Sequence, residues 1–74
     1  MKEKFQDRYK ILGLNIAYYR KLSGLTQEQL AERLDLDRTT ISKIELATVG
    51  VSLDVLFEMS EVFGITPEKL LKMR

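Results

Sequence analysis

Two short amphipathic segments meet at the four letters "LDLD" inside the run Leu25–Glu45, and this junction restricts the fold more than any other feature. Apolar residues recur at helical spacing before the junction, and Ile41 and Ile44 continue the pattern after it. Two helices joined by about three residues must cross steeply, so their backbones come close together. Ala31 is small enough for that crossing, and Leu36 can fill the corner beneath it. The sequence therefore predicts a tight corner between two helices.

Helical spacing of apolar residues extends over most of the chain, and no run supports a pair of strands. We expect five helices, at about 5–22, 27–34, 38–46, 53–63 and 67–73. Their expected N-caps are Thr26, Asp37, Ser52 and Thr66, with Pro67 at a first helical position. The expected inner face of the fourth helix is Leu53, Leu56, Phe57, Ser60 and Phe63. The predicted fold class is all-α, with residues 1–74 forming one compact five-helix domain.

The composition argues against an enzyme. The 74 residues contain no cysteine and no histidine, so a thiolate site and the commonest general base and metal ligand are missing. We expect no catalytic activity, no metal and no cofactor, and a chain this short leaves no room for a domain that senses a small-molecule effector. No apolar run approaches the roughly 18 residues of a membrane span, so we expect no membrane contact and a cytoplasmic location.

The charges are unevenly distributed although the net charge is only +1. Residues 1–23 hold six basic and two acidic residues, which gives +4. Residues 24–46 hold three basic and five acidic residues (−2), and residues 47–74 hold three and four (−1). An excess of basic residues in the first helix is compatible with a polyanionic partner. Charge alone fits an ordinary solvated helix better.

The run "LGLNIAYYRKLSGLTQEQLAERLDLDRTTISKIE", followed by "SLDVLFEMSEVFGITPEKLL", resembles the phage-repressor-like (Cro/C1-type, XRE family) helix-turn-helix domains over about residues 12–71. The matches in register are Leu25-Thr26-Gln27, Leu30-Ala31, Ile41-Ser42 with Ile44-Glu45, and Ser52-Leu53. The resemblance implies that the second and third helices form the helix-turn-helix. It further implies a sequence-specific transcriptional regulator of the repressor or controller type, which binds a two-fold operator in double-stranded DNA as a homodimer. The alternative is a protein-interaction module, such as an antitoxin-type or regulator-binding subunit.

The resemblance assigns roles to the matching residues of the helix-turn-helix. Its expected base readers, on the outer face of the recognition helix, are Arg38, Thr39 and Lys43. Its expected phosphate contacts are Gln27, Thr26, Thr40 and Ser42. The alternative for Arg38 and Lys43 is an ordinary solvated face. Gln27 could instead serve only at the start of its helix.

The resemblance also implies that Arg20 and Glu45 form a partly buried ion pair that fixes the recognition helix, although they could be unrelated surface charges. Two departures from the family stand out. The segment 46–51 carries no charge where relatives often place basic residues, and Asp35 stands where many have glycine. Apolar residues off the expected core face provide a candidate dimer surface, unless they only broaden the core: Val49, Val51, Val55, Met59 and Val62.

Overall fold

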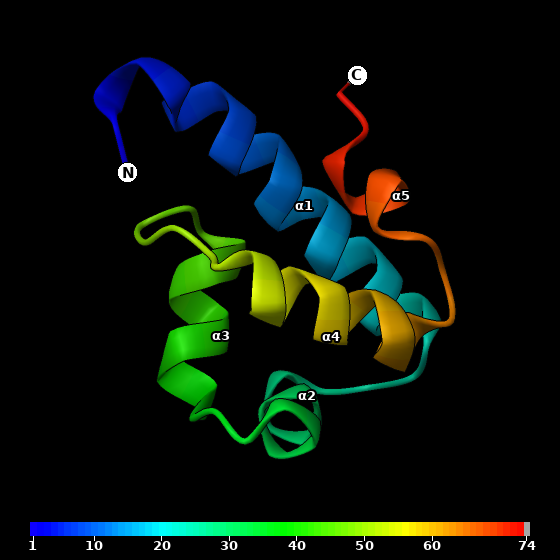
Figure 1. Ribbon diagram of the computed structural model, residues 1–74. Helices are drawn as coiled ribbons and strands as arrows, with labels where there is room; N and C mark the ends of the chain where they lie inside the picture. Colours follow the sequence, from blue (N-terminus) through cyan, green and yellow to red (C-terminus); the bar gives the residue numbers. More distant parts are fainter. Residues whose placement is uncertain (74) are drawn as a thin grey trace.

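The computed structural model describes residues 1–73 and contains, within them, five α-helices and one short 3-10 turn (Figure 1). The elements are η1 (Glu3–Phe5), α1 (Gln6–Leu22), α2 (Gln27–Leu34), α3 (Arg38–Glu45), α4 (Leu53–Phe63) and α5 (Pro67–Leu71). The predicted all-α arrangement of five helices is confirmed, and α2 and α3 are in contact. Arg74, which belongs to the predicted domain, lies outside the described residues.

Three predicted helix bounds differ from the structure by one or two residues. α1 begins one residue later than predicted, because the chain first forms the turn η1, and α3 ends one residue earlier. α5 ends at Leu71 rather than at residue 73. The buried side chain of Asn15 donates hydrogen bonds to the carbonyls of Leu70 (2.9 Å) and Lys72 (3.0 Å), which holds an extended chain after α5.

At three of the four predicted N-caps, the side chain caps the first turn of the helix. The Thr26 hydroxyl accepts a hydrogen bond from the Gln29 N–H, and the Gln29 side chain accepts one from the Thr26 N–H, which completes a capping box. The Ser52 hydroxyl accepts from the N–H of Val55 at the start of α4. Thr66 makes no such side-chain bond, so α5 begins with Pro67 at a first-turn position but without the predicted cap.

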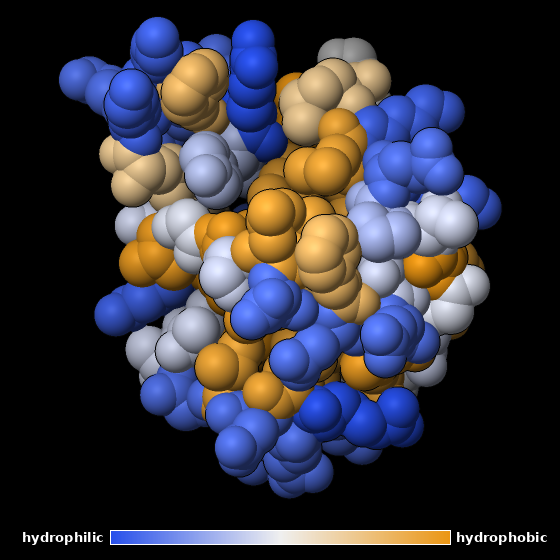
Figure 2. Space-filling view, in the orientation of Figure 1, coloured by the Kyte–Doolittle hydropathy of each residue, from blue (hydrophilic) through white to orange (hydrophobic). Residues whose placement is uncertain are grey.

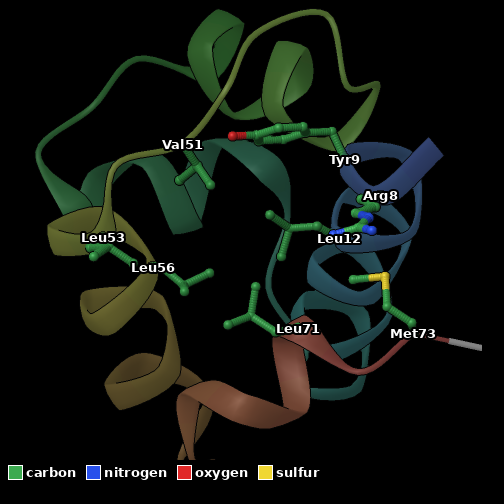
Figure 3. A pocket seen from close by; sticks show the side chains of 8 residues that line it. All are labelled: Arg8, Tyr9, Leu12, Val51, Leu53, Leu56, Leu71 and Met73. Atoms are coloured by element: carbon green, nitrogen blue, oxygen red, sulfur yellow. The ribbon is translucent and has the colours of Figure 1, made fainter. Parts of the chain in front are cut away.

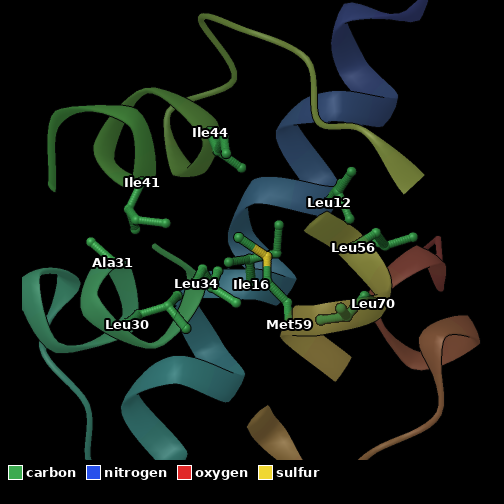
Figure 4. Packing of buried hydrophobic residues seen from close by; sticks show 10 residues of the cluster. All are labelled: Leu12, Ile16, Leu30, Ala31, Leu34, Ile41, Ile44, Leu56, Met59 and Leu70. Carbon is green, nitrogen blue, oxygen red and sulfur yellow. The ribbon is translucent and has the colours of Figure 1, made fainter. Parts of the chain in front are cut away.

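One apolar core joins all five helices (Figure 4). Its buried members are Leu12, Ile16, Leu30, Ala31, Leu34, Ile41, Ile44, Leu56, Met59 and Leu70. Ile16 of α1 is fully buried, as are Leu30 of α2 and Ile41 of α3. Each helix therefore contributes at least one side chain to a shared core, so short helices that would be marginal alone stabilise one another. Among residues 1–73, no helix is long and apolar enough to cross a membrane.

Gly13 allows α1 to approach the end of α3 very closely. A Cβ atom built on Gly13 would lie 2.3 Å from the Glu45 carbonyl oxygen and 2.9 Å from that of Ile44. Cβ atoms in proteins essentially never come this close to other atoms, so only glycine fits here without a shift of the backbone. Glycine inside a helix normally costs about 1 kcal/mol relative to alanine, and here close packing of α1 on α3 compensates for that cost.

The inner face predicted for α4 is partly wrong. Leu56 and Ser60 are buried as expected, but Leu53 is 64% exposed and Phe57 is 47% exposed. Met59, which was assigned to the candidate dimer surface, is completely buried. Packing of α4 against α1, α2 and α5 explains the difference, because contact on several sides widens and rotates the buried stripe.

One residue of the candidate dimer surface is misplaced for the same reason. Met59 belongs to the core, and Val51, Val55 and Val62 are only partly exposed because they pack against that core. Of the five residues, Val49, in the loop after α3, is the most exposed. Met59 is therefore excluded from any dimer surface, and the packing of the three valines on the core is what the alternative, a broad core face, predicts.

Candidate nucleic-acid interface

The corner between α2 and α3 is built from local hydrogen bonds. Asp35 adopts the left-handed conformation, with φ of 55° and ψ of 41°, and its N–H is directed to the carbonyls of Ala31 and Glu32. The Leu36 N–H donates to the Ala31 carbonyl at 2.9 Å, and its side chain packs against the core. Aspartate tolerates this conformation better than most residues, so the turn closes without glycine.

Asp37 begins α3 and fixes its first turn. The carboxylate accepts a hydrogen bond of 2.7 Å from the Thr40 N–H. This bond holds the pKa of Asp37 below its usual value of 3.8, because it stabilises the charged form. The carboxylate is therefore ionised at neutral pH, and its negative charge complements the positive end of the helix dipole.

The structure brings the three predicted base readers to one surface of α3. Arg38, Thr39 and Lys43 are all exposed, whereas Ile41 and Ile44 are buried on the opposite side of the helix. Among residues 1–73, none of the three outward side chains has a hydrogen-bond partner or an ion pair shown by the structure. α3 therefore presents a polar, basic face whose donors and acceptors are available to a ligand.

The predicted phosphate contacts are more varied. Thr26 already uses its oxygen to cap α2, while Thr40 and Ser42 are half-buried beside the exposed face. Gln27 is also half-buried, and its Nε2 donates to Oε1 of Glu45 at 3.1 Å. Gln27 is thus part of the support beneath α3, and a phosphate would have to share its amide group.

An ion pair fixes α3 against α1, as the sequence predicts. Nε of Arg20 lies 2.6 Å from Oε2 of Glu45, and Nη2 lies 3.1 Å from Oε1. The Arg20 side chain also donates to the Leu25 carbonyl at 2.9 Å. Only 10% of the Arg20 side chain and 7% of the Glu45 side chain are exposed. The structure thus contains the pair that the resemblance implies, and little of either side chain reaches solvent.

Comparisons with known proteins agree with this geometry. The helix-turn-helix family model matches residues 16–70, which include all of α2, α3 and α4. The chain belongs to the helix-turn-helix family. It is therefore a DNA-binding transcriptional regulator of the Cro/C1 type, and the corner between α2 and α3 is the motif that gives the family its name.

Several relatives of this helix-turn-helix protein are control proteins. It is 37% identical over 67 residues to control protein C.SmaI of Serratia marcescens, a match that covers 90% of this chain and 80% of the relative. It is 47% identical over 49 residues to control protein C.BamHI of Bacillus amyloliquefaciens, covering 66% and 60% of the two chains. The structure of the restriction-modification controller protein C.AhdI from Aeromonas hydrophila superposes with a TM-score of 0.85 at 26% identity, covering 92% and 99%.

Three supporting residues of the helix-turn-helix protein were missed at the level of sequence. Gly13 allows α1 to touch α3, Asn15 holds the chain after α5, and Gln6 donates from Nε2 to the Ala47 carbonyl at 2.9 Å. A glycine inside an otherwise regular helix, and an asparagine beside its apolar stripe, were the available signals. Nothing local marks Gln6, because its partner lies 41 residues away in the chain.

Proposed function

We propose that the protein controls transcription by reading operator DNA with α3 in the major groove, in the manner of a restriction-modification controller. The observation that carries this proposal is the exposed face of Arg38, Thr39 and Lys43 on a helix held by a buried ion pair. The major groove is about 12 Å wide and admits one helix. The controller names of the relatives support the regulatory role.

Each residue of this face has a chemical partner in DNA. Arg38 can donate two parallel hydrogen bonds to O6 and N7 of one guanine, and Lys43 can donate to the same kind of acceptor. The methyl group of Thr39 can touch the methyl group of thymine. We assign phosphate oxygens rather than bases to Thr40 and Ser42, which are half-buried beside the face, and to Thr26 and Gln27 at the start of α2.

Replacement of Arg38 by alanine tests the reading role. We expect Arg38→Ala to weaken binding to a selected operator by about 5- to 150-fold, which corresponds to roughly 1–3 kcal/mol. For operators already changed at the base that Arg38 reads, the same substitution should reduce the affinity much less. Arg33→Ala, which removes an exposed arginine from α2, is the control and should preserve the base preferences. Titration of both variants against single-base operator variants at fixed salt gives the answer, and equal weakening on every operator would rule out base reading.

We further propose that the protein binds DNA as a homodimer, with recognition helices about 34–36 Å apart on a two-fold operator. The proposed dimer surface shares Val51 with the surface predicted from sequence, but its other residues are different. Leu53 of α4 is exposed and lines a groove of about 400 Å³ between α1, α4 and residues 71–73 (Figure 3). Phe57, one turn further along α4, is also exposed. Leu71 and Met73 line the groove and are also exposed.

Apolar residues dominate the centre of this face (Figure 2). A second copy fits it because a surface with apolar projections next to an apolar groove is complementary to itself, as a two-fold contact requires. We expect Phe57→Asp to shift sedimentation from dimer toward monomer, while Leu14→Asp, an equally drastic change at an exposed site on α1, should not. A complex that saturates at one chain per operator would contradict the proposed dimer.

A further inference from the structure

The start of the chain carries basic side chains beyond the part that matches the family model. Lys2, Lys4 and Arg8 are all exposed, and they precede residue 16, where the match begins. Within residues 1–73, none of these three charges takes part in an ion pair, because the ion pair that the structure shows joins Arg20 and Glu45. We call these three residues the N-terminal basic cluster.

An aromatic ring holds two members of the cluster in place. Nζ of Lys4 lies 5.1 Å from the centre of the Phe5 ring, and the Arg8 guanidinium carbon lies 5.3 Å from it. Both distances are within the range of a cation–π contact. The two charges are therefore gathered around one half-buried ring rather than spread around the helix.

The same segment is attached to the loop that follows α3. Gln6 donates to the Ala47 carbonyl, and the Tyr9 ring lies 3.7 Å from where a Cβ atom of Gly50 would be. In Figure 1 the start of the chain, this loop and α3 lie along one side of the molecule, whereas α5 lies on the other side. The N-terminal basic cluster is thus positioned beside the C-terminal end of the recognition helix.

The loop itself brings no charge to that position. Residues 46–51 read "LATVGV", and Leu46 and Val49 are exposed. A helix in the major groove lies between two phosphate backbones, so the surface next to its end faces negative charge. The uncharged loop cannot neutralise those phosphates, and the cluster attached to it can.

We propose that the N-terminal basic cluster binds the DNA phosphate backbone beside the C-terminal end of α3. This inference rests on the proposed DNA-reading function and adds a second contact, which strengthens binding without recognising bases. The cluster thereby supplies the phosphate contacts that the loop between α3 and α4 lacks.

The salt dependence of binding tests the proposal. Each phosphate contact contributes about −0.9 to the slope of log K against log salt concentration. We expect Lys2→Gln/Lys4→Gln to reduce the magnitude of the slope by about 1.8 per bound chain, and therefore by about 3.6 for the proposed dimer. Between 50 and 200 mM salt, the wild-type dimer should then lose about 150-fold more affinity than the variant dimer. Arg8 is left unchanged because it also lines the groove of the proposed dimer.

A charge-matched control separates a local contact from a general effect of net charge. Lys69→Gln/Lys72→Gln removes two exposed lysines at and just after α5, on the other side of the molecule from α3. This variant should keep the wild-type slope, and both variants should keep the wild-type base preferences. The proposed phosphate contact would be overturned if all three proteins had equal salt slopes, or if both variants lost the same amount of slope.

Failure of the proposed function would look different. The salt slope is also measurable on DNA of random sequence, where α3 has no cognate bases to read. A wild type without base preference would contradict operator reading. Even then, the difference in salt slope between the wild type and Lys2→Gln/Lys4→Gln would decide whether Lys2 and Lys4 touch phosphates.

Discussion

The two connections that flank α3 each contain a residue in the left-handed conformation, yet different parts of the protein hold them. Asp35, with φ of 55°, is exposed and bonded to carbonyls three and four residues before it. Ala47, with φ of 60°, is only 2% exposed, and its carbonyl accepts a hydrogen bond from Gln6. The start of the recognition helix is therefore fixed locally, whereas its end, which local bonds from Ala47 and Thr48 also close, is held in addition by α1.

A helix that reads DNA needs both a fixed angle to its neighbour and a fixed position in the domain, and different contacts provide the two. The local turn sets the angle between α2 and α3, whereas the contacts with α1 set the position of α3 relative to the rest of the domain. Gly13 and the Arg20–Glu45 pair meet α3 at its last residue. Changes on the α1 side should consequently cost more stability than changes at the turn.

The largest expected effect is at the buried ion pair. Glu45→Gln leaves the buried Arg20 guanidinium without its charged partner and weakens the acceptor of the Gln27 amide. Because both side chains are about nine-tenths buried, we expect a loss of about 3 kcal/mol in the free energy of unfolding, measured by urea denaturation.

A double variant distinguishes the pair from two separate contributions. Arg20→Met/Glu45→Leu replaces both charges with apolar side chains and should recover most of the loss. Arg20→Met and Glu45→Leu are also measured separately. If their losses in the free energy of unfolding simply add up in the double variant, the two residues do not depend on each other, and the contrast between the two ends of α3 weakens.

The next largest effect is expected at Gly13. Gly13→Ala places a Cβ atom against the Glu45 carbonyl, so α1 or α3 must move, and we expect a loss of about 2 kcal/mol. Gly50→Ala is the matched control, because its Cβ atom would meet only the Tyr9 ring at an ordinary 3.7 Å. Thermal or urea denaturation of both variants checks the prediction. A Gly13→Ala protein as stable as the control would show that α1 does not restrain the end of α3.

Sequence reasoning succeeds where the determining contacts are local. The corner at Asp35 and the caps at Asp37 and Thr26 all depend on residues three to four positions apart, so a pattern reveals them. The Arg20–Glu45 pair follows from the resemblance of the chain to a family. Spacing could not predict it, because 25 residues separate Arg20 from Glu45.

Reasoning from the sequence fails where several helices share one neighbour. The helical period of α4 identifies one apolar stripe, but it cannot say which of two adjacent stripes faces the core. Met59 was therefore placed on the surface and Phe57 inside, the reverse of the structure. The missing information was the position of α5 and α2 around α4, which no local pattern encodes.

The smallest expected effect is at the local end of α3, and it depends on pH. The folded-state pKa of Asp37 lies below 3.8 because its carboxylate accepts the Thr40 N–H. Stability from this charge is therefore fully present above the unfolded pKa and is lost as the pH falls through the folded value. Asn also caps helices well but does not titrate, which makes Asp37→Asn the appropriate comparison.

We expect the stability of the wild type relative to Asp37→Asn to fall between pH 7 and pH 3, in urea denaturation at both values. The change should be smaller than the effect of Glu45→Gln or Gly13→Ala, because Asp37 is exposed and bonds only within the first turn of α3. Every other carboxylate is present in both proteins, so its titration cancels in the difference. A constant difference across this range would mean that the charge of Asp37 does not stabilise the start of α3, and that the amide serves equally well as a cap.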